Sequence, residues 1–359
     1  MNASKELYDK ERNERFAKAL SEKVYTSLTD IESPTYMKLF VPNKGGVNQD
    51  HHWGLTGFPM NGASQAFLAL EAIEKGYEGR AWFRYDQAHQ AGGQVKANEK
   101  SVMIKDYNRK LSQSFFPSLF NADQIKGLPE VTQAKKPDIG LAKDKALILA
   151  DASKIPVAYV STRQEAGYDG QAGVINLAPM DAFQTDGLYH AHVIKALAQS
   201  TAHPDMMGRF VGDSLKQKAM EAFRVNVAST IMCERIGLPF ELGGDSKYTK
   251  VWAEVAQQEP EQIVKVFSDA ERMCYQLGVF AHRLNKTPLV EQTDEMKQHK
   301  EKQQEKIAEI EEASQEEFRQ QAKARTNERN KEREKQLDQE VKTAVKRTRK
   351  QAQEQAQAL

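Results

Sequence analysis

The stretch RAWFRYDQAHQAGGQVKANEKSVMI, residues 80–104, decides how the first part of the chain folds. Its opening WFRY, residues 82–85, is rich in aromatic side chains, which predicts a β-strand. Residues 88–91 then predict a short helical turn, which Gly92-Gly93 ends. Residues 101–104 are mostly apolar and predict a second strand. The stretch therefore predicts two strands joined by a helical turn.

Apolar residues with helical spacing lie on both sides of this stretch. In the first such segment, Phe16, Leu20, Val24 and Leu28 recur every four residues, which is typical of an amphipathic helix. Short apolar runs at 156–160 and 174–177 predict further strands. The mixture of helices and short strands predicts an α+β fold. The predicted helices are 6–28, 62–75, 145–153, 186–200, 215–237, 250–257 and 262–277.

Composition excludes several classes of protein. The chain has 359 residues and a net charge of +1, which argues against a uniformly basic nucleic-acid binder. It has no apolar run of 18 residues, so a membrane-spanning helix is not expected. The first 20 residues are charged throughout and lack a secretory signal, so we expect a cytoplasmic protein. Cys233 and Cys274, the two cysteines, lie in apolar helical segments and are predicted to be core residues.

The last 70 residues differ from the rest of the chain. They contain 16 Lys or Arg, 16 Asp or Glu and 13 Gln, and no Gly or Pro follows Pro288. This composition predicts a solvated helix with Glu–Lys pairs four residues apart. Two alternatives stay open: a coiled coil or partner helix, and a nucleic-acid contact made by the basic residues 342–350.

Residues 80–110 combine bases with aromatic side chains. Seven Lys or Arg stand against three Asp or Glu, a local excess of +4, with Trp82, Phe83, Tyr85 and Tyr107 between them. Single-stranded nucleic acid is bound by such a combination, because cations contact phosphates and aromatic faces stack on bases. An aromatic residue in a strand is more often part of the core, and this alternative stays open for Trp82.

The same stretch resembles the N-terminal domain of the ArdC-type antirestriction family. Asn98 stands where the family has Gly, and Asn also tolerates a positive φ. Upstream, Tyr36 and Phe40 stand for two tryptophans of the family, with Lys38 between them, and residues 119–128 resemble the segment that ends the domain. The residues that fit the family pattern are Trp82, Tyr85, Gln87, Ala88, Gly92, Gly93, Val95, Lys96, Glu99 and Lys100.

Residues 150–209 resemble the zincin-like metallopeptidase domain of the same family. A zincin carries His-Glu-x-x-His on a helix, where the two His bind Zn²⁺ and the Glu is the general base. The resemblance places Lys195, Ala196 and Gln199 at these positions, and Asn226 at a third ligand position, a Glu in the family. Lysine has no acceptor near neutral pH and alanine takes no proton. We therefore predict no metal, no cofactor, no catalytic residue and no enzymatic activity.

The helix that carries these positions has a polar stripe made of His192, Lys195, Gln199 and His203. We interpret the stripe as solvated or as lining a cleft, with a metal site built from the histidines as the alternative. His192 and His203 lie about 16 Å apart along a helix axis, too far apart to share one ion.

Taken with the resemblance, these observations predict three parts. They are a DNA-binding domain over 1–130, an inactive zincin-like domain over 138–288, and a charged helical or coiled-coil tail over 289–359. The residues that the resemblance and the charge pattern assign to DNA are Tyr36, Lys38, Phe40, Trp82, Arg84, Tyr85, Lys96 and Lys100.

The resemblance implies a single-stranded DNA-binding protein of a plasmid or similar mobile element, acting in conjugative transfer or antirestriction. One alternative is an active zinc metallopeptidase with displaced ligands. Another is a structural adaptor in which residues 290–359 recruit a protein partner or a second copy of the chain.

Overall fold

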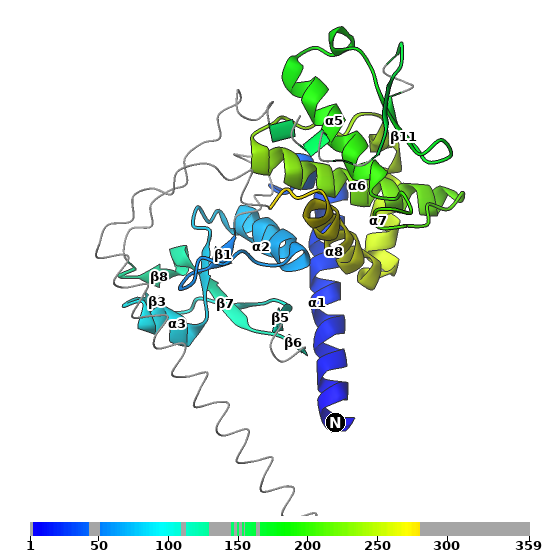
Figure 1. Ribbon diagram of the computed structural model, residues 1–359. Coiled ribbons are helices and arrows are strands. Elements are labelled where there is room, and N and C mark those ends of the chain that lie inside the picture. The colour runs from blue at the N-terminus through cyan, green and yellow to red at the C-terminus, as the bar shows by residue number, and fades with distance from the viewer. Residues whose placement is uncertain are drawn as a thin grey trace, which may run out of the picture. The chain divides into compact units, whose positions relative to one another are not determined.

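The structure is a computed structural model. It describes residues 3–42, 51–108, 113–128, 145–146, 149–150, 153, 155–162 and 166–280. All of them belong to one compact unit, Met1–Asn285 (Figure 1). The predicted tail over 289–359 lies outside the described residues, as does most of the boundary between the two predicted domains.

The first part of the chain combines two long helices with short strands. Its four-stranded sheet has the order β1-β2-β7-β4, in which β1 and β2 are parallel and the other neighbours are antiparallel. Two antiparallel pairs, β3-β8 and β5-β6, complete it. The elements are α1 (Ala3–Thr29), the 3-10 helix η1 (Lys38–Phe40), β1 (His52–Trp53), α2 (Gly62–Lys75), β2 (Ala81–Phe83), α3 (Tyr85–Gln90), β3 (Gln94–Val95), β4 (Val102–Met103), β5 (Asp106–Asn108), β6 (Gln113–Phe115), β7 (Ser118–Asn121), η2 (Ala122–Gln124) and β8 (Ile125–Lys126).

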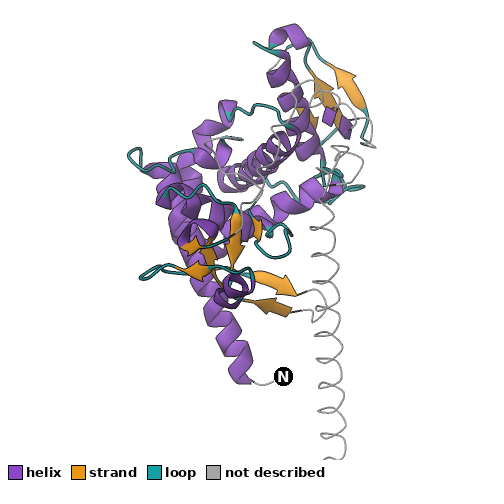
Figure 2. Cartoon of the chain, turned by 90° about the vertical axis from the view of Figure 1, so that its left-hand side faces the viewer, coloured by secondary structure: helices purple, strands orange, loops and turns teal. Residues whose placement is uncertain are grey.

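The second part is mainly helical. Its three-stranded sheet has the order β10-β11-β9 and packs against α5, while α6 lies between α5 and α8 (Figures 1 and 2). The elements are β9 (Val157–Tyr159), β10 (Gly167–Asp169), β11 (Val174–Leu177), η3 (Met180–Ala182), α5 (Asp186–Ser200), α6 (Leu215–Ile236), η4 (Gly243–Tyr248), α7 (Thr249–Gln258) and α8 (Pro260–Gln276).

The α+β fold is confirmed, and six of the seven predicted helices appear with ends shifted by no more than a few residues. The seventh, 145–153, lies partly outside the described residues. Local signals in the sequence set those ends. The Asn61 side chain accepts the Ser64 N–H at the start of α2, and Gly76 ends this helix at φ 69°. Ser214 caps α6 in the same way, and Gly237 ends it at φ 92°.

The predicted strand over 82–85 is partly wrong. The strand β2 ends at Phe83, and Tyr85 is the first residue of α3. The reason is local, because the Gln87 side chain accepts the Arg84 N–H at 3.1 Å and starts the helix there. The helix begins three residues earlier than predicted.

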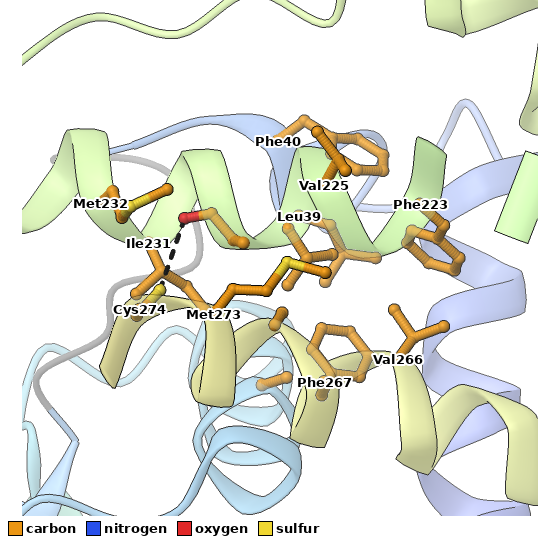
Figure 3. Packing of buried hydrophobic residues seen from close by; sticks show 14 of the residues in the cluster. Leu39, Phe40, Phe223, Val225, Ile231, Met232, Val266, Phe267, Met273 and Cys274 are labelled. Carbon is orange, nitrogen blue, oxygen red and sulfur yellow. Dashed lines mark hydrogen bonds between the residues drawn. The ribbon is translucent and has the colours of Figure 1, made fainter. Parts of the chain in front are cut away.

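One hydrophobic core joins the two parts of the chain. The helix α1 packs against α2, α7 and α8, and η1 packs against α6. Phe40 of η1 lies with its ring centroid 5.4 Å from that of Trp252, and Trp252 stacks on Phe223 at 4.9 Å. Phe40 and Phe223 appear in Figure 3 among the side chains that α6, α8 and η1 bury together. An N-terminal segment therefore completes the core of the zincin-like part.

The cysteines lie where the sequence predicts them. Cys233 and Cys274 are fully buried, and burial raises the pKa of both thiols. The Cys274 thiol contacts the carbonyl oxygen of Ala228 across the interface between α6 and α8 (Figure 3). Within the described ranges, no helix is long and apolar enough to span a bilayer.

A buried hydrogen bond holds β2 to the segment before it. The Trp82 indole Nε1–H donates to His51 Nδ1 at 2.9 Å, and both residues are buried. Burial, with lesser effects from the charges of Arg80 and His52, lowers the pKa of His51 to about 3. His51 is therefore neutral in the folded protein near pH 7.

We predict that this histidine makes the protein less stable in mild acid. Between its unfolded pKa of about 6.5 and its folded pKa, the unfolded chain binds the extra proton, so the free energy of unfolding falls as the pH falls. From pH 6.5 to 4.5, wild type should lose about 2 kcal/mol more than His51→Asn, which keeps an acceptor for Trp82. Urea denaturation at several pH values measures this. His89→Asn, at an exposed position, is the matched control, and equal slopes in all three proteins would contradict the prediction.

Candidate functional site

The predicted DNA-binding residues are positioned by β2, α3 and β3. All three residues of β2 are buried, so the first side chains to reach solvent after it are Arg84 and Tyr85. The chain then turns at Gly92, whose φ of 79° suits glycine, and enters β3. The pair β3-β8 places Gln94 opposite Lys126. The start of α3 and the β3-β8 pair thus carry the polar face of this part.

Trp82 is not part of that face. Its side chain is 0 % exposed, and its ring lies edge-on to Tyr77 with 6.2 Å between centroids. The prediction that Trp82 stacks on a base is wrong for this conformation. The physical reason is that β2 is a central strand between β1 and β7, and its indole N–H already has His51 as a partner inside the core.

Phe40 is also a core residue, and this part of the predicted surface needs correction. It is 4 % exposed, because it packs against Phe223 and Trp252. Tyr36 is exposed and Lys38 is half-buried. Both belong to the η1 region, which packs against α1, α2 and α6, whereas β2 packs against β1, β7 and α3. The structure does not bring these two groups of predicted residues into contact.

Arg84 and Tyr85 remain on the surface. The Tyr85 side chain is 60 % exposed, and its ring lies edge-on to Phe120 with 6.4 Å between centroids. The Arg84 guanidinium forms two hydrogen bonds with Asp86, at 3.1 and 2.8 Å. Both partners of this pair are exposed, so water and salt weaken it.

Lys96 and Lys100 lie on the turn that follows β3. The Lys96 ammonium donates to the carbonyl oxygen of Asp123 at 2.5 Å, and Gln124 donates to the carbonyl oxygen of Lys100 at 3.0 Å. Both lysines are exposed. Asn98 between them has φ 65°, so it adopts a positive φ, which asparagine tolerates.

Sequence reasoning missed two residues of these sites. Lys126 is exposed on β8 beside β3, and only the pairing of the two strands reveals that it belongs to the same face as Lys96. Asp245 follows Gly243-Gly244, which predicts a turn and nothing more. Its partners, Lys195 and Asn226, come from α5 and α6, and no local pattern in the sequence predicts these contacts.

In the zincin-like part, Lys195 and Asn226 meet at Asp245. The Lys195 ammonium lies 2.8 Å from Asp245 Oδ2 and 3.3 Å from the carbonyl oxygen of Leu242. The Asn226 amide donates to the same carboxylate oxygen at 2.9 Å. The helices α5 and α6 are both joined to η4 at this carboxylate.

The other two positions of the family's motif have different surroundings. Gln199 Oε1 accepts the backbone N–H of Tyr168 at 3.1 Å, which ties α5 to β10. Gly167 leaves room for this contact, since a Cβ there would lie 3.0 Å from the same oxygen. Ala196 is 1 % exposed and belongs to the core. A carboxylate at position 196 would have to enter the apolar core.

These residues do not fit a zinc ion. An ammonium occupies the first ligand position, and Gln199 and Asn226 direct amide groups to protein partners. Among the described residues, no three His, Cys, Asp or Glu side chains are grouped so that they could hold a metal ion. His203 lies beyond α5, which ends at Ser200, so the predicted polar stripe on this helix does not extend to it. Its Nδ1 accepts the N–H of Asp205 at 3.1 Å.

Two cavities flank the Lys195–Asp245 pair, and both are lined by Gln199 and Asp245. One, of about 650 Å³, has Lys195 and His192 in its wall, so the polar stripe of α5 lines a cleft at these positions. The other, of about 630 Å³, lies beside β10 and the loop before α6. Phe210 on this loop is 86 % exposed. The cleft of the zincin-like part thus persists without a set of metal ligands.

Comparison with known proteins matches both parts of the chain. Residues 19–132 match the profile of the N-terminal domain of anti-restriction factor ArdC. Residues 145–269 match the profile of the zincin-like metallopeptidase family. The two matches follow one another in the order that the sequence resemblance predicts.

Curated relatives align with little more than half of this chain. Two DNA primases TraC from Escherichia coli are 24 % identical over 236 residues and 25 % identical over 249 residues. These alignments take in 57 % and 60 % of this chain, but 22 % and 17 % of the primases. The chain therefore spans about a fifth of the length of these relatives.

Solved structures show the same fold. The Mn(II)-bound crystal structure of antirestriction protein ArdC from plasmid R388 has a TM-score of 0.59 and 22 % identity, over 76 % of this chain and 99 % of that one. The metal-free structure of the same protein has a TM-score of 0.57, over 74 % and 98 %. With the ArdC N-terminal domain followed by a zincin-like domain, the chain belongs to the ArdC-type antirestriction family.

Proposed function

We propose that the first part of the chain binds single-stranded DNA. The observation that carries this proposal is the exposed ring of Tyr85, which follows Arg84 at the start of α3, the helix that packs against β3. A ring exposed on one side can stack on an unpaired base while neighbouring cations contact phosphates. We define the DNA-binding surface as the following set: Arg84, Tyr85, Lys96, Lys100 and Lys126.

In the free protein, the side chains of this surface make contacts that DNA phosphates and bases can replace. The Arg84–Asp86 pair is exposed and therefore weak, so a phosphate can replace the carboxylate at little cost. Phe120 supports the Tyr85 ring from the protein side at 6.4 Å between centroids. Tyr36 and Lys38, on the η1 region, would then contact only a strand that extends beyond this surface.

We further propose that the protein acts in antirestriction during the transfer of plasmid DNA. Its relatives support this role by their names, which are an antirestriction protein of plasmid R388 and two DNA primases. DNA that enters a cell as a single strand would be the substrate of such a surface. Coating that strand would keep other proteins from it.

The zincin-like part is proposed to be a pseudo-peptidase. Lys195 and Asn226 both contact the Asp245 carboxylate, and Gln199 accepts a backbone N–H. The three residues at the ligand positions therefore bind other protein groups instead of a metal. Ala196 stands where a general base is required and is buried. The fold is kept because its core, which includes Phe40, does not depend on an ion.

Removing the stacking ring tests the DNA proposal. Tyr85→Ala should weaken binding of a single-stranded oligonucleotide by about 5- to 150-fold, the loss of one stacked base. Phe210→Ala, an exposed aromatic of the other part of the chain, is the matched control and should bind like wild type. Fluorescence anisotropy measures both. Equal affinity of Tyr85→Ala and wild type would exclude this ring as the stacking residue.

Removing cations should change the salt dependence. The double variant Arg84→Ala/Lys100→Ala should lower the magnitude of the slope of log Kobs against log[salt] by about 1.4, because each phosphate contact contributes about 0.7 with single strands. Lys265→Ala, exposed on α8, should leave the slope unchanged. If the double variant keeps the wild-type slope, these two side chains do not contact phosphates.

Metal analysis tests the pseudo-peptidase proposal. After incubation with Zn²⁺ or Mn²⁺ and dialysis, the protein should hold far less than one equivalent of either metal, and a chelator should leave its Tm unchanged. Inductively coupled plasma mass spectrometry and thermal denaturation give the two measurements. One equivalent of zinc, lost in chelator together with peptide hydrolysis, would instead favour the displaced-ligand peptidase.

A further inference from the structure

The Lys195 ammonium is surrounded by a cluster of polar and aromatic groups. Three groups of η4 and the segment before it surround the ammonium: Asp245 Oδ2 at 2.8 Å, the Leu242 carbonyl oxygen at 3.3 Å, and the Phe240 ring, whose centroid lies 6.0 Å away. From α6, Asn226 reaches the same carboxylate oxygen at 2.9 Å. One cation thus connects two helices and a loop.

The pair is largely withdrawn from water. The Lys195 side chain is 17 % exposed and the Asp245 side chain is 24 % exposed. Charges at such positions interact more strongly than a surface pair, and loss of one leaves the other poorly compensated. The neighbouring cavity of about 650 Å³ gives small solutes a path to the ammonium, because Lys195, Phe240 and Asp245 all line it.

The groups around the ammonium match its chemistry. An ammonium has three donors and no acceptor, and here it meets a carboxylate, a carbonyl oxygen and an aromatic face. Zinc prefers imidazole, thiolate and carboxylate ligands in a tetrahedron, and this set offers one carboxylate only. The site is therefore suited to a monovalent organic cation.

We propose that Lys195 is a built-in cation that takes the place of the metal ion of a zincin, and that without it the pocket binds a small alkylammonium. The charge holds the 240–245 segment against α5 and α6, as a metal would hold its ligands. This proposal rests on the proposed absence of zinc from the site and is independent of DNA binding.

The test removes the cation and returns it from solution. Lys195→Ala deletes the atoms of n-propylammonium, so this ion is the probe. We expect Lys195→Ala to lower Tm by about 3–8 °C, since it leaves the Asp245 charge without its counter-ion. n-Propylammonium chloride should recover at least half of that loss in a saturable manner. 1-Propanol and NaCl at the same concentrations should not.

Control variants separate the effect of the Lys195 charge from the effect of the volume that its side chain fills. Lys195→Met keeps the chain but not the charge, so it should lose stability like Lys195→Ala and gain nothing from n-propylammonium, because its side chain fills the site. Adding Asp245→Asn to Lys195→Met should recover part of the loss, because no charge is then left unpaired. Wild type should not respond to the probe.

Several results would overturn the proposal. They are a Lys195→Met variant as stable as wild type, an equal response of wild type and Lys195→Ala to n-propylammonium, and stabilisation of Lys195→Ala by Zn²⁺ at lower concentration than by n-propylammonium. If n-propylammonium does not restore the Tm of Lys195→Ala and the wild type binds no zinc, only the proposal of a built-in cation is rejected. Zinc bound to wild type would reject the pseudo-peptidase proposal as well.

Discussion

The packing of Phe40 against Trp252 and Phe223 is the contact on which the arrangement of this molecule depends. Phe40 belongs by sequence to the part that matches the ArdC N-terminal domain, but it completes the core between α6 and α7 of the zincin-like part. The helix α1 adds to this by packing along α7 and α8. The zincin-like fold therefore has the N-terminal segment as part of its core.

This shared core limits where the proposed DNA-binding surface can lie. Phe40 and Trp82, which have the best rings for stacking, lie inside it and are unavailable to a ligand. The side chains left on the surface are those that follow the end of β2, where the chain leaves the sheet for α3. Tyr85 is exposed for that reason. The buried strand β2 thus determines where the proposed DNA-binding residues lie, although none of them belongs to β2.

The sequence predicts the helices well, because an apolar face with a period near 3.6 and capping residues such as Asn61 and Gly76 are local signals. It also indicates where the ligand positions of the zincin motif fall. It does not separate a buried from an exposed aromatic in a short strand, since Trp82 and Tyr85 share the same neighbours in sequence. Asp245 was missed because its contacts with Lys195 and Asn226 join residues far apart in the chain.

The substitutions in the zincin motif differ from random decay in one respect. A metal ion in this fold would have joined two helices, and a loss of ligands alone would leave polar groups without partners inside the cleft. Instead, Lys195 and Asn226 both reach one carboxylate, and Gln199 accepts a backbone N–H of β10. The contacts of Lys195 and Gln199 join α5 to η4 and to β10, and the contact of Asn226 joins α6 to η4. Such contacts hold the two sides of the cleft together, which is what the proposed scaffold role requires.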